Sequence, residues 1–137
     1  MPDRDYSHRD VTDKLGIKPG SIVAFDEQAA PLDEALRRKV LERTGRDPAG
    51  PEEPADVVLA TLHAGMDAAM LLRTWRSHIK PSGGIWLLTP KRGQPGYLDQ
   101  RELIQAGGEA GLVDNKSCSV DETTSGMHFV IRRSDRG

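Results

Sequence analysis

Three segments of the chain carry short apolar runs that predict β-strands. Residues 21–25 form the first run, which ends at two acidic residues, and residues 56–62 form a second, nearly continuous run. Residues 85–89 form the third. A nearly continuous apolar run such as residues 56–62 is typical of a strand that is covered on both faces, as parallel sheets require. We therefore predict a buried, mainly parallel sheet.

Between these strands the apolar positions recur every three or four residues, which predicts helices. Leu32, Leu36 and Val40 share one face of a first long helix, which Pro31 can begin and Gly45 can end. Further helices are predicted over residues 67–80, closed by the segment 81–84, over about residues 98–110, and, shorter, over residues 10–16. Two adjacent glycines near the end of the last helix each cost about 1 kcal/mol relative to alanine, which predicts a weak final turn.

The C-terminal part of the chain predicts a long antiparallel hairpin. Met127, Phe129 and Ile131 occupy alternate positions in the predicted strand 126–132, and residues 112–120 supply its partner. Strands and helices therefore alternate until the final strand pair. This order indicates an α/β fold, a three-layer sandwich with right-handed crossovers and helices on both sides of the sheet.

The segment 47–54 and the carboxyl edge of the sheet both matter for function in this architecture. The three prolines between residues 47 and 54 exclude a helix or a central strand there, so we predict a surface connection. Ligands of open α/β sheets bind outside the carboxyl ends of the strands. Here that edge consists of Asp26 and Glu27, residues 61–64 and residues 89–92.

Composition narrows the classes of function. The chain has 137 residues, which fits one domain over residues 1–137, and its net charge of -2 disfavours nucleic-acid binding because that needs a positive field. The single cysteine, Cys118, excludes an internal disulfide and a cysteine-rich zinc site. The polar start and the lack of an apolar run of about 18 residues predict neither a signal peptide nor a membrane span. We expect a cytoplasmic protein without a metal site.

Several segments are similar to known families. Residues 15–21, residues 79–84 and the terminal hairpin resemble the skeleton of a class I S-adenosylmethionine methyltransferase that lacks its second and third strands. The whole chain resembles the actinobacterial domain-of-unknown-function family 3052 (DUF3052). The motifs that carry this resemblance are Asp-Val-Val-Leu at 56–59, Ile-Trp-Leu-Leu-Thr-Pro-Lys at 85–91, Ala-Gly-Leu-Val-Asp-Asn-Lys at 110–116 and Ser-Val-Asp-Glu-Thr at 119–123.

The resemblance implies a Rossmann-like domain and a five-stranded, mostly parallel sheet. Its strand order should be 1-2-3-5-4, with strand five antiparallel to the others, and the family has no settled activity. One position departs from the family pattern. Thr124 stands where the family usually has a tryptophan before Ser125 and Gly126.

The loop after the first strand bears on cofactor binding. A nucleotide or methyl-donor site needs glycines here so that the backbone can approach the ligand, and residues 25–31 contain none. Asp26, Glu27, Asp33 and Glu34 add negative charge that repels a phosphate. The resemblance further implies that the strand with the usual ribose-binding acid is absent. We therefore predict no cofactor, and methyl transfer is disfavoured.

Three candidate ligand-binding residues follow the second and third strands. His63 can transfer protons near neutral pH, although a lone histidine before Ala-Gly also fits an ordinary loop residue. Lys91 and Arg92 can hold a carboxylate or a phosphate, and the alternative is a solvated turn. His63 as acid or base, with the two cations as anion clamps, would make a small enzyme or a ligand-binding protein.

Three further candidates lie in the terminal hairpin. Lys116, Asp121 and Glu122 belong to the segments that resemble the family, and they can form either a recognition surface or a structural ion pair. Cys118 has no histidine beside it in sequence, so a nucleophilic role would need a spatial partner such as His128. We interpret it as structural.

The leading hypothesis is a non-catalytic, Rossmann-like binding or regulatory module, because the α/β scaffold is complete but its cofactor loop lacks glycines. The alternative is the small enzyme or ligand-binding protein described above. A third hypothesis is self-association, in which the exposed face of the hairpin pairs with its copy across a two-fold axis. A protein partner or a homodimer is thus possible on this reading.

Overall fold

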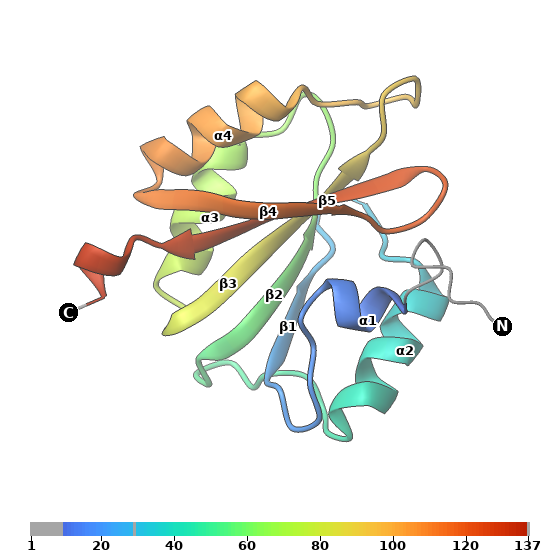
Figure 1. Ribbon diagram of the computed structural model, residues 1–137, viewed down its shortest axis with the longest axis vertical. Helices are drawn as coiled ribbons and strands as arrows, with labels where there is room; N and C mark the ends of the chain where they lie inside the picture. Colours follow the sequence, from blue (N-terminus) through green and yellow to red (C-terminus); the bar gives the residue numbers. More distant parts are fainter. Residues whose placement is uncertain (1–9, 29, 137) are drawn as a thin grey trace, which may run out of the picture.

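The computed structural model describes residues 10–28 and 30–136, and helices and strands alternate along it (Figure 1). In chain order the elements are α1 (Val11–Lys14), β1 (Val23–Asp26), α2 (Glu34–Thr44), β2 (Ala55–Thr61), α3 (Ala68–Arg76), β3 (Ile79–Pro90), α4 (Gln100–Glu109), β4 (Leu112–Ser119), β5 (Thr124–Ile131) and the 3-10 helix η2 (Arg133–Asp135). The predicted order of strands and helices is confirmed.

All five strands form one sheet in the order β1-β2-β3-β5-β4, as the resemblance implied. β1, β2 and β3 are parallel, with Val23 level with Val57 and Val57 level with Gly84. β5 runs antiparallel to both β3 and β4. β1 and β4 are therefore the two edges of the sheet.

The sheet separates two hydrophobic clusters. α1 and α2 cover one face, and α3 and α4 cover the other (Figure 1). Successive side chains of a strand point to opposite faces, so Trp86 packs with Leu36 and Val40 of α2. Phe129 packs on the other side with Leu72 of α3. The fold is the predicted three-layer sandwich.

The two parallel crossovers have opposite hands, which corrects the prediction that both are right-handed. The steps from β1 to β2 and from β2 to β3 go in the same direction across the sheet, but α2 and α3 lie on opposite faces. One crossover is therefore of the rare left-handed kind. The apolar stripe of α2 is matched to Trp86 and Leu59 on its own face, and this packing outweighs the general preference.

The boundary between α3 and β3 is also corrected. The predicted helix over residues 67–80 ends at Arg76, and β3 already begins at Ile79. Ile79 continues the helical spacing in sequence, but it pairs with Ala55 of β2, and Ala55 N donates to His78 O (2.9 Å). Pairing with the neighbouring strand thus takes residues 79–84 into the sheet.

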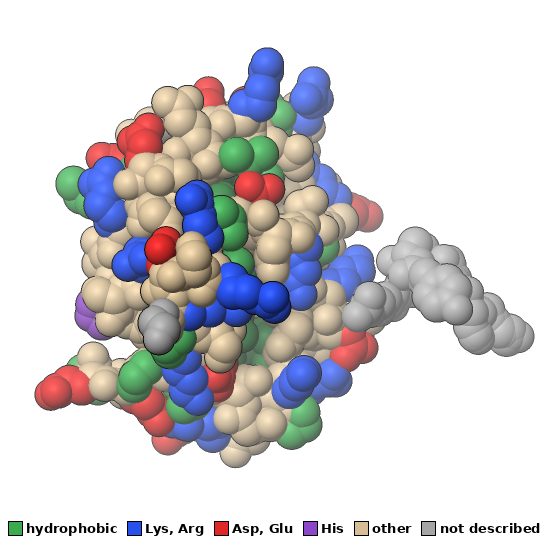
Figure 2. All heavy atoms as spheres, turned by 60° about the vertical axis from the view of Figure 1, so that its left-hand side comes forward, with side chains coloured by type: hydrophobic (Ala, Val, Ile, Leu, Met, Phe, Trp, Pro, Cys, Tyr) green, Lys and Arg blue, Asp and Glu red, His purple; other side chains and the backbone are tan. Residues whose placement is uncertain are grey.

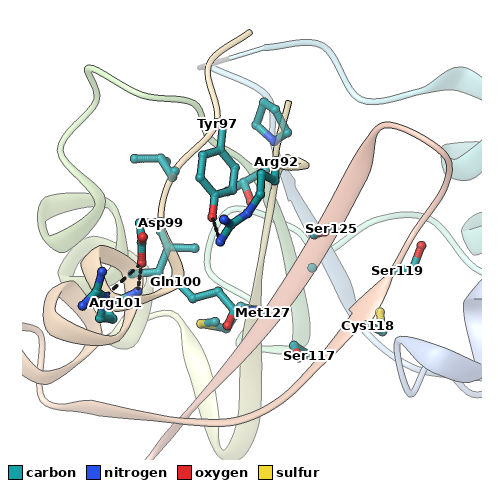
Figure 3. A pocket seen from close by; sticks show the side chains of 15 residues that line it. Arg92, Tyr97, Asp99, Gln100, Arg101, Ser117, Cys118, Ser119, Ser125 and Met127 are labelled. Atoms are coloured by element: carbon teal, nitrogen blue, oxygen red, sulfur yellow. Dashed lines mark hydrogen bonds and ion pairs between the residues drawn. The ribbon is translucent and has the colours of Figure 1, made fainter. Parts of the chain in front are cut away.

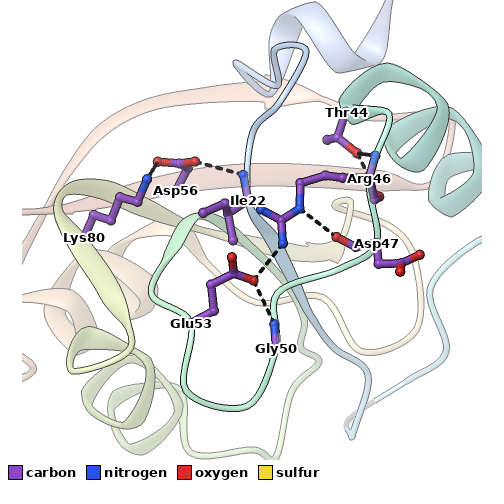
Figure 4. Close-up of polar contacts among 8 residues, drawn as sticks. All are labelled: Ile22, Thr44, Arg46, Asp47, Gly50, Glu53, Asp56 and Lys80. Carbon is purple, nitrogen blue, oxygen red and sulfur yellow. Dashed lines mark hydrogen bonds and ion pairs between the residues drawn. The ribbon is translucent and has the colours of Figure 1, made fainter.

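The proline-rich segment 47–54 is the predicted surface connection, and it runs beside the outer edge of β1. Ala49 N donates to Val23 O (2.8 Å). Glu53 Oε1 accepts from Arg46 Nη2 (2.7 Å) and from Gly50 N (3.0 Å), which holds the loop together (Figure 4). An exposed strand edge can pair with another chain, and this loop occupies part of that edge.

Candidate functional site

The carboxyl ends of the parallel strands lie at the same level, because Asp26 pairs with Ala60 and Thr61 pairs with Leu88. The loops after β1, β2 and β3 therefore meet at one edge of the sheet. The turn between β4 and β5 reaches the same edge, since Lys91 N donates to Thr123 O (2.8 Å). This is where ligands bind in open α/β sheets.

The loop after β1 uses its own side chains to bind its backbone amides. Gln28 N donates to Asp26 Oδ1 (3.1 Å), and Leu32 N donates to Glu27 Oε1 (2.8 Å). Glu27 also forms an ion pair with Arg37, whose guanidinium lies 4.9 Å from the centre of the Phe25 ring. These amides are the donors that a phosphate or carboxylate would need. Here they already have partners.

The same loop is tied to its neighbours on both sides. Thr61 Oγ donates to Ala30 O (2.5 Å), which draws the loop onto the end of β2. Trp75 Nε1 of α3 donates to Asp26 Oδ2 (2.7 Å). The loop is therefore held against the sheet. This agrees with its lack of glycines, which a loop that approaches a cofactor closely would need.

Beside this loop lies a hollow of about 440 Å³, the apolar pocket. It is bounded by the start of α2, the ends of β2 and β3, the loop after β3 and the β4–β5 turn. Most of its wall is apolar, formed by Ala30, Pro31, Leu32, Leu36, Leu62, Leu88, Pro90, Pro95 and Val120. Polar groups enter from Asp33, Thr61, His63, Thr89, Asp121 and Thr124.

Two of the six predicted site residues line the apolar pocket. His63 is half-buried there, and its Nδ1 lies 2.9 Å from Ala64 O. Asp121 has a structural task in the turn, because its Oδ1 accepts from Thr123 N and Thr124 N, both at 2.8 Å. Its carboxylate is therefore engaged by backbone.

Lys91 and Arg92 do not join His63. The Arg92 guanidinium lies 5.5 Å from the centre of the Tyr97 ring and lines a second pocket, on the α4 side of the sheet (Figure 3). Lys91 Nζ donates to Ser119 Oγ (2.7 Å). The three residues that sequence placed in one groove are thus divided between the two sides of β3.

The remaining two candidates lie apart from both pockets. Lys116 Nζ is 5.8 Å from the centre of the Trp86 ring, on the α1 side of the sheet. Glu122 is exposed in the β4–β5 turn. Among the ion pairs of the described residues, none joins Lys116 to Asp121 or Glu122.

Cys118 is half-buried against the cluster on the α2 face. Burial raises the pKa of its thiol, which disfavours the reactive thiolate. The Nδ1 atom of His128, the partner considered for it, instead lies 2.6 Å from Asn115 Oδ1.

Charge on the surface is mixed. Figure 2 shows Lys and Arg side chains scattered over the face in view, with Asp and Glu between them. Within the described part of the chain, no group of three His, Cys, Asp or Glu residues could hold a metal ion. No helix there is long and apolar enough to cross a membrane.

The sequence profile of the family described as "Protein of unknown function (DUF3052)" matches residues 12–133. The chain belongs to the DUF3052 family. Uncharacterized proteins of Mycobacterium tuberculosis and Mycobacterium bovis are each 31% identical to it over 115 residues, which cover 78% of this chain and 70% of theirs.

Several solved structures with the same fold are described as methyltransferases. A proposed methyltransferase from Thermoplasma acidophilum has a TM-score of 0.62 at 12% identity, covering 98% of this chain and 77% of that one. An S-adenosylmethionine-dependent methyltransferase from Aquifex aeolicus has a TM-score of 0.59 at 13% identity, covering 89% and 88%. Aeropyrum pernix fibrillarin, solved with bound S-adenosylmethionine, has a TM-score of 0.52 at 15% identity, covering 88% and 73%. At these identities the likeness concerns the fold alone.

The resemblance places a tryptophan of the family at position 124 of this chain. Thr124 lines the apolar pocket. A tryptophan at this position would project toward that space, so the threonine leaves it open.

Sequence reasoning missed the hydroxyl side chains at the edge of the sheet in this DUF3052 chain. Thr61 closes the loop after β1, and Thr89, Ser119 and Ser125 line the pocket beside α4. The sequence does contain a signal for these hydroxyl groups, because a threonine stands at the end of each of two buried strands. The strand pairing that aligns Thr89 with the two serines could not be read from local pattern.

Proposed function

We propose that this chain is a non-catalytic binding module, which takes an apolar small molecule into the apolar pocket. The observation that supports the proposal is the position of this pocket at the carboxyl edge of the sheet. The pocket lies beside the loop after β1, whose backbone amides are bonded to side chains of the same loop. Its volume of about 440 Å³ falls in the usual range for small-molecule sites, and a mainly apolar wall with a few polar groups is typical of them.

The closed loop after β1 argues against methyl transfer. The fibrillarin with the same fold carries S-adenosylmethionine, but here the amides of Gln28 and Leu32 are bonded to Asp26 and Glu27. We expect no binding of S-adenosylmethionine in an isothermal titration at millimolar ligand. Binding at one site per chain would overturn the non-catalytic assignment.

A small enzyme that uses His63 is the weaker alternative. Catalysis at this pocket would need a second group to act with the imidazole. Two carboxylates line the pocket: Asp121, whose oxygen is bonded to the turn, and Asp33 before α2, which forms no hydrogen bond with His63 among the described residues. The geometry therefore favours binding over turnover.

The test of the apolar pocket is a calorimetric titration with N-phenyl-1-naphthylamine, an uncharged aromatic probe. We expect saturable binding at one site. Thr124→Trp fills the pocket and should weaken the affinity at least about tenfold. Thr123→Trp is the matched control, because Thr123 is exposed and does not line the pocket. Equal binding by the two variants, or no saturation, would show that this pocket is not a binding site.

We place the module in the cytoplasm, which suits the free, half-buried thiol of Cys118. Cell fractionation of the native host tests this location.

Assembly through the β4 edge is opposed by a bulge between Asp114 and Lys116 and by the charge of Lys116, two features that discourage strand pairing. Light scattering over a wide concentration range should report no dimer formed through this edge.

A further inference from the structure

The second pocket lies on the opposite side of β3, between α4 and the β4–β5 hairpin (Figure 3). Its volume is about 660 Å³. In contrast to the apolar pocket, many of its side chains are polar or charged, among them Arg92, Tyr97, Ser117, Ser119 and Ser125. It is therefore suited to a different kind of ligand.

One wall carries a row of three hydroxyl groups from three neighbouring strands. Thr89 of β3 pairs with Ser125 of β5, and Ser125 pairs with Ser119 of β4. Leu87 and Met127, two residues away from Thr89 and Ser125, pack toward α3 and α4. Because side chains alternate along a strand, the hydroxyl row faces the same side as these two residues.

Within the described part of the chain, the Thr89 hydroxyl is buried without a hydrogen-bond partner. Thr89 is 5% exposed and lines the pocket, and no described residue forms a hydrogen bond with its Oγ. Buried polar groups in folded proteins are nearly always hydrogen-bonded, so an exception calls for an explanation. A polar ligand in the pocket would supply the missing partner.

Two cations approach this row from the loop after β3. Lys91 Nζ donates to Ser119 Oγ (2.7 Å), and Arg92 is held over the ring of Tyr97 and donates to its hydroxyl (3.4 Å). The acidic residue on the wall is Asp99, whose Oδ1 accepts from Arg101 N (2.8 Å) at the start of α4. This carboxylate is thus engaged, and positive charge is in excess.

We infer that this pocket binds the phosphate group of a small molecule. The Ser119 hydroxyl already donates to Asp121 O (3.3 Å) and accepts from Lys91, so among the described residues the free hydroxyl donors of this row are Thr89 and Ser125. Together with the Arg92 guanidinium and the nearby charge of Lys91, they match the several oxygens and the charge of a phosphate, whereas a carboxylate offers only two oxygens. The pocket is larger than a phosphate ion, so the remainder of the ligand has room beside α4. This pocket shares Thr89 and Pro90 of β3 with the apolar pocket, but its other lining residues are different.

The experiment is a titration with inorganic phosphate and with phenyl phosphate at constant ionic strength, followed by amide chemical shifts. We expect saturable shifts at Ser117, Ser119 and Ser125, with tighter binding of the ester. Arg92→Gln should weaken the affinity by about tenfold or more, because charge-assisted hydrogen bonds are strong. Arg73→Gln, an exposed arginine of α3 outside the pocket, should leave it unchanged.

Thr89→Val supplies a second, independent variant. It removes the hydroxyl with little change of shape, so we expect several-fold weaker phosphate binding with an unchanged or raised midpoint of thermal unfolding. The proposal fails if phosphate causes no saturable shifts, if Arg73→Gln weakens binding as much as Arg92→Gln, or if Thr89→Val binds like the unmodified chain.

Discussion

The imidazole of His128 packs against the indole of Trp86, with the two ring centroids 4.8 Å apart. The two residues are level with each other on β5 and β3, and the indole is completely buried. Burial, and after it the charge of Lys116, lower the pKa of His128 to about 4. The native protein therefore holds this histidine in its neutral form.

Acid should destabilise the fold through His128. In the unfolded chain its pKa is about 6.5, so between about pH 6.5 and pH 4 the unfolded state binds a proton that the native state does not. The free energy of unfolding should fall over this range by about 3 kcal/mol at most. Urea unfolding at pH 7 and pH 4.5 measures the loss.

The variant His128→Gln isolates this contribution from that of the carboxylates, such as Asp10, whose pKa is also lowered in the native state. Its unfolding free energy should depend less on pH than that of the unmodified chain. Parallel curves for the two proteins would contradict the assignment.

The adjacent glycines of α4 should respond to alanine in opposite directions. A Cβ at Gly107 would overlap the ring of Phe129, so Gly107→Ala should destabilise the protein by about 1–3 kcal/mol. A Cβ at Gly108 meets nothing within 4 Å, and Gly108→Ala should stabilise the helix by up to about 1 kcal/mol. Thermal unfolding of both variants checks the pair, and shifts of the same sign would refute this packing.

Replacement of each of the two tryptophans by phenylalanine should lower the free energy of unfolding by different amounts. Trp86 Nε1 donates to Leu15 O (2.9 Å) in the core, so Trp86→Phe leaves a cavity and a buried carbonyl without a partner, at a cost of about 3 kcal/mol. Trp75 is half-buried, and water can replace its bond to Asp26. Trp75→Phe should cost about 1 kcal/mol. Denaturant titrations that rank the two variants in the reverse order would argue against this account.

Asp121 should matter for stability, whereas its neighbour Glu122 should not. Asp121→Ala removes the acceptor of the Thr123 and Thr124 amides and should cost about 1 kcal/mol. Glu122→Ala changes an exposed side chain in the same turn and should stay within about 0.5 kcal/mol of the unmodified protein. Comparison of the two unfolding midpoints separates a structural aspartate from one that serves only recognition.

The location of most strands and helices was predictable from sequence, because each depends on a local pattern. The apolar runs of β1, β2 and β3 and the alternation in β5 depend on neighbouring residues only. The predicted end of α3 was wrong, because the true end depends on a contact with a distant strand. Ile79 fits the helical spacing in sequence, and only its pairing with Ala55 of β2 places it in a strand.

The candidate site was predictable only in part. The absence of glycines after β1 is visible in the sequence, and it agrees with a loop whose amides are bonded to Asp26 and Glu27. His63 was placed correctly at the carboxyl edge of the sheet. His63 does not share a pocket with Lys91 and Arg92: His63 lines the apolar pocket, Arg92 lines the pocket beside α4, and Lys91 bonds to Ser119.

The sequence by itself determined the alternation of strands and helices, the buried character of the central strands and the lack of a glycine-rich loop. Each of these follows from residues that are close together in the chain. The tertiary structure decided the hand of the crossovers, the alignment of Thr89, Ser125 and Ser119, and the fit of Gly107 against Phe129. These features depend on contacts between distant segments, and packing fixes them only when the whole sheet has formed.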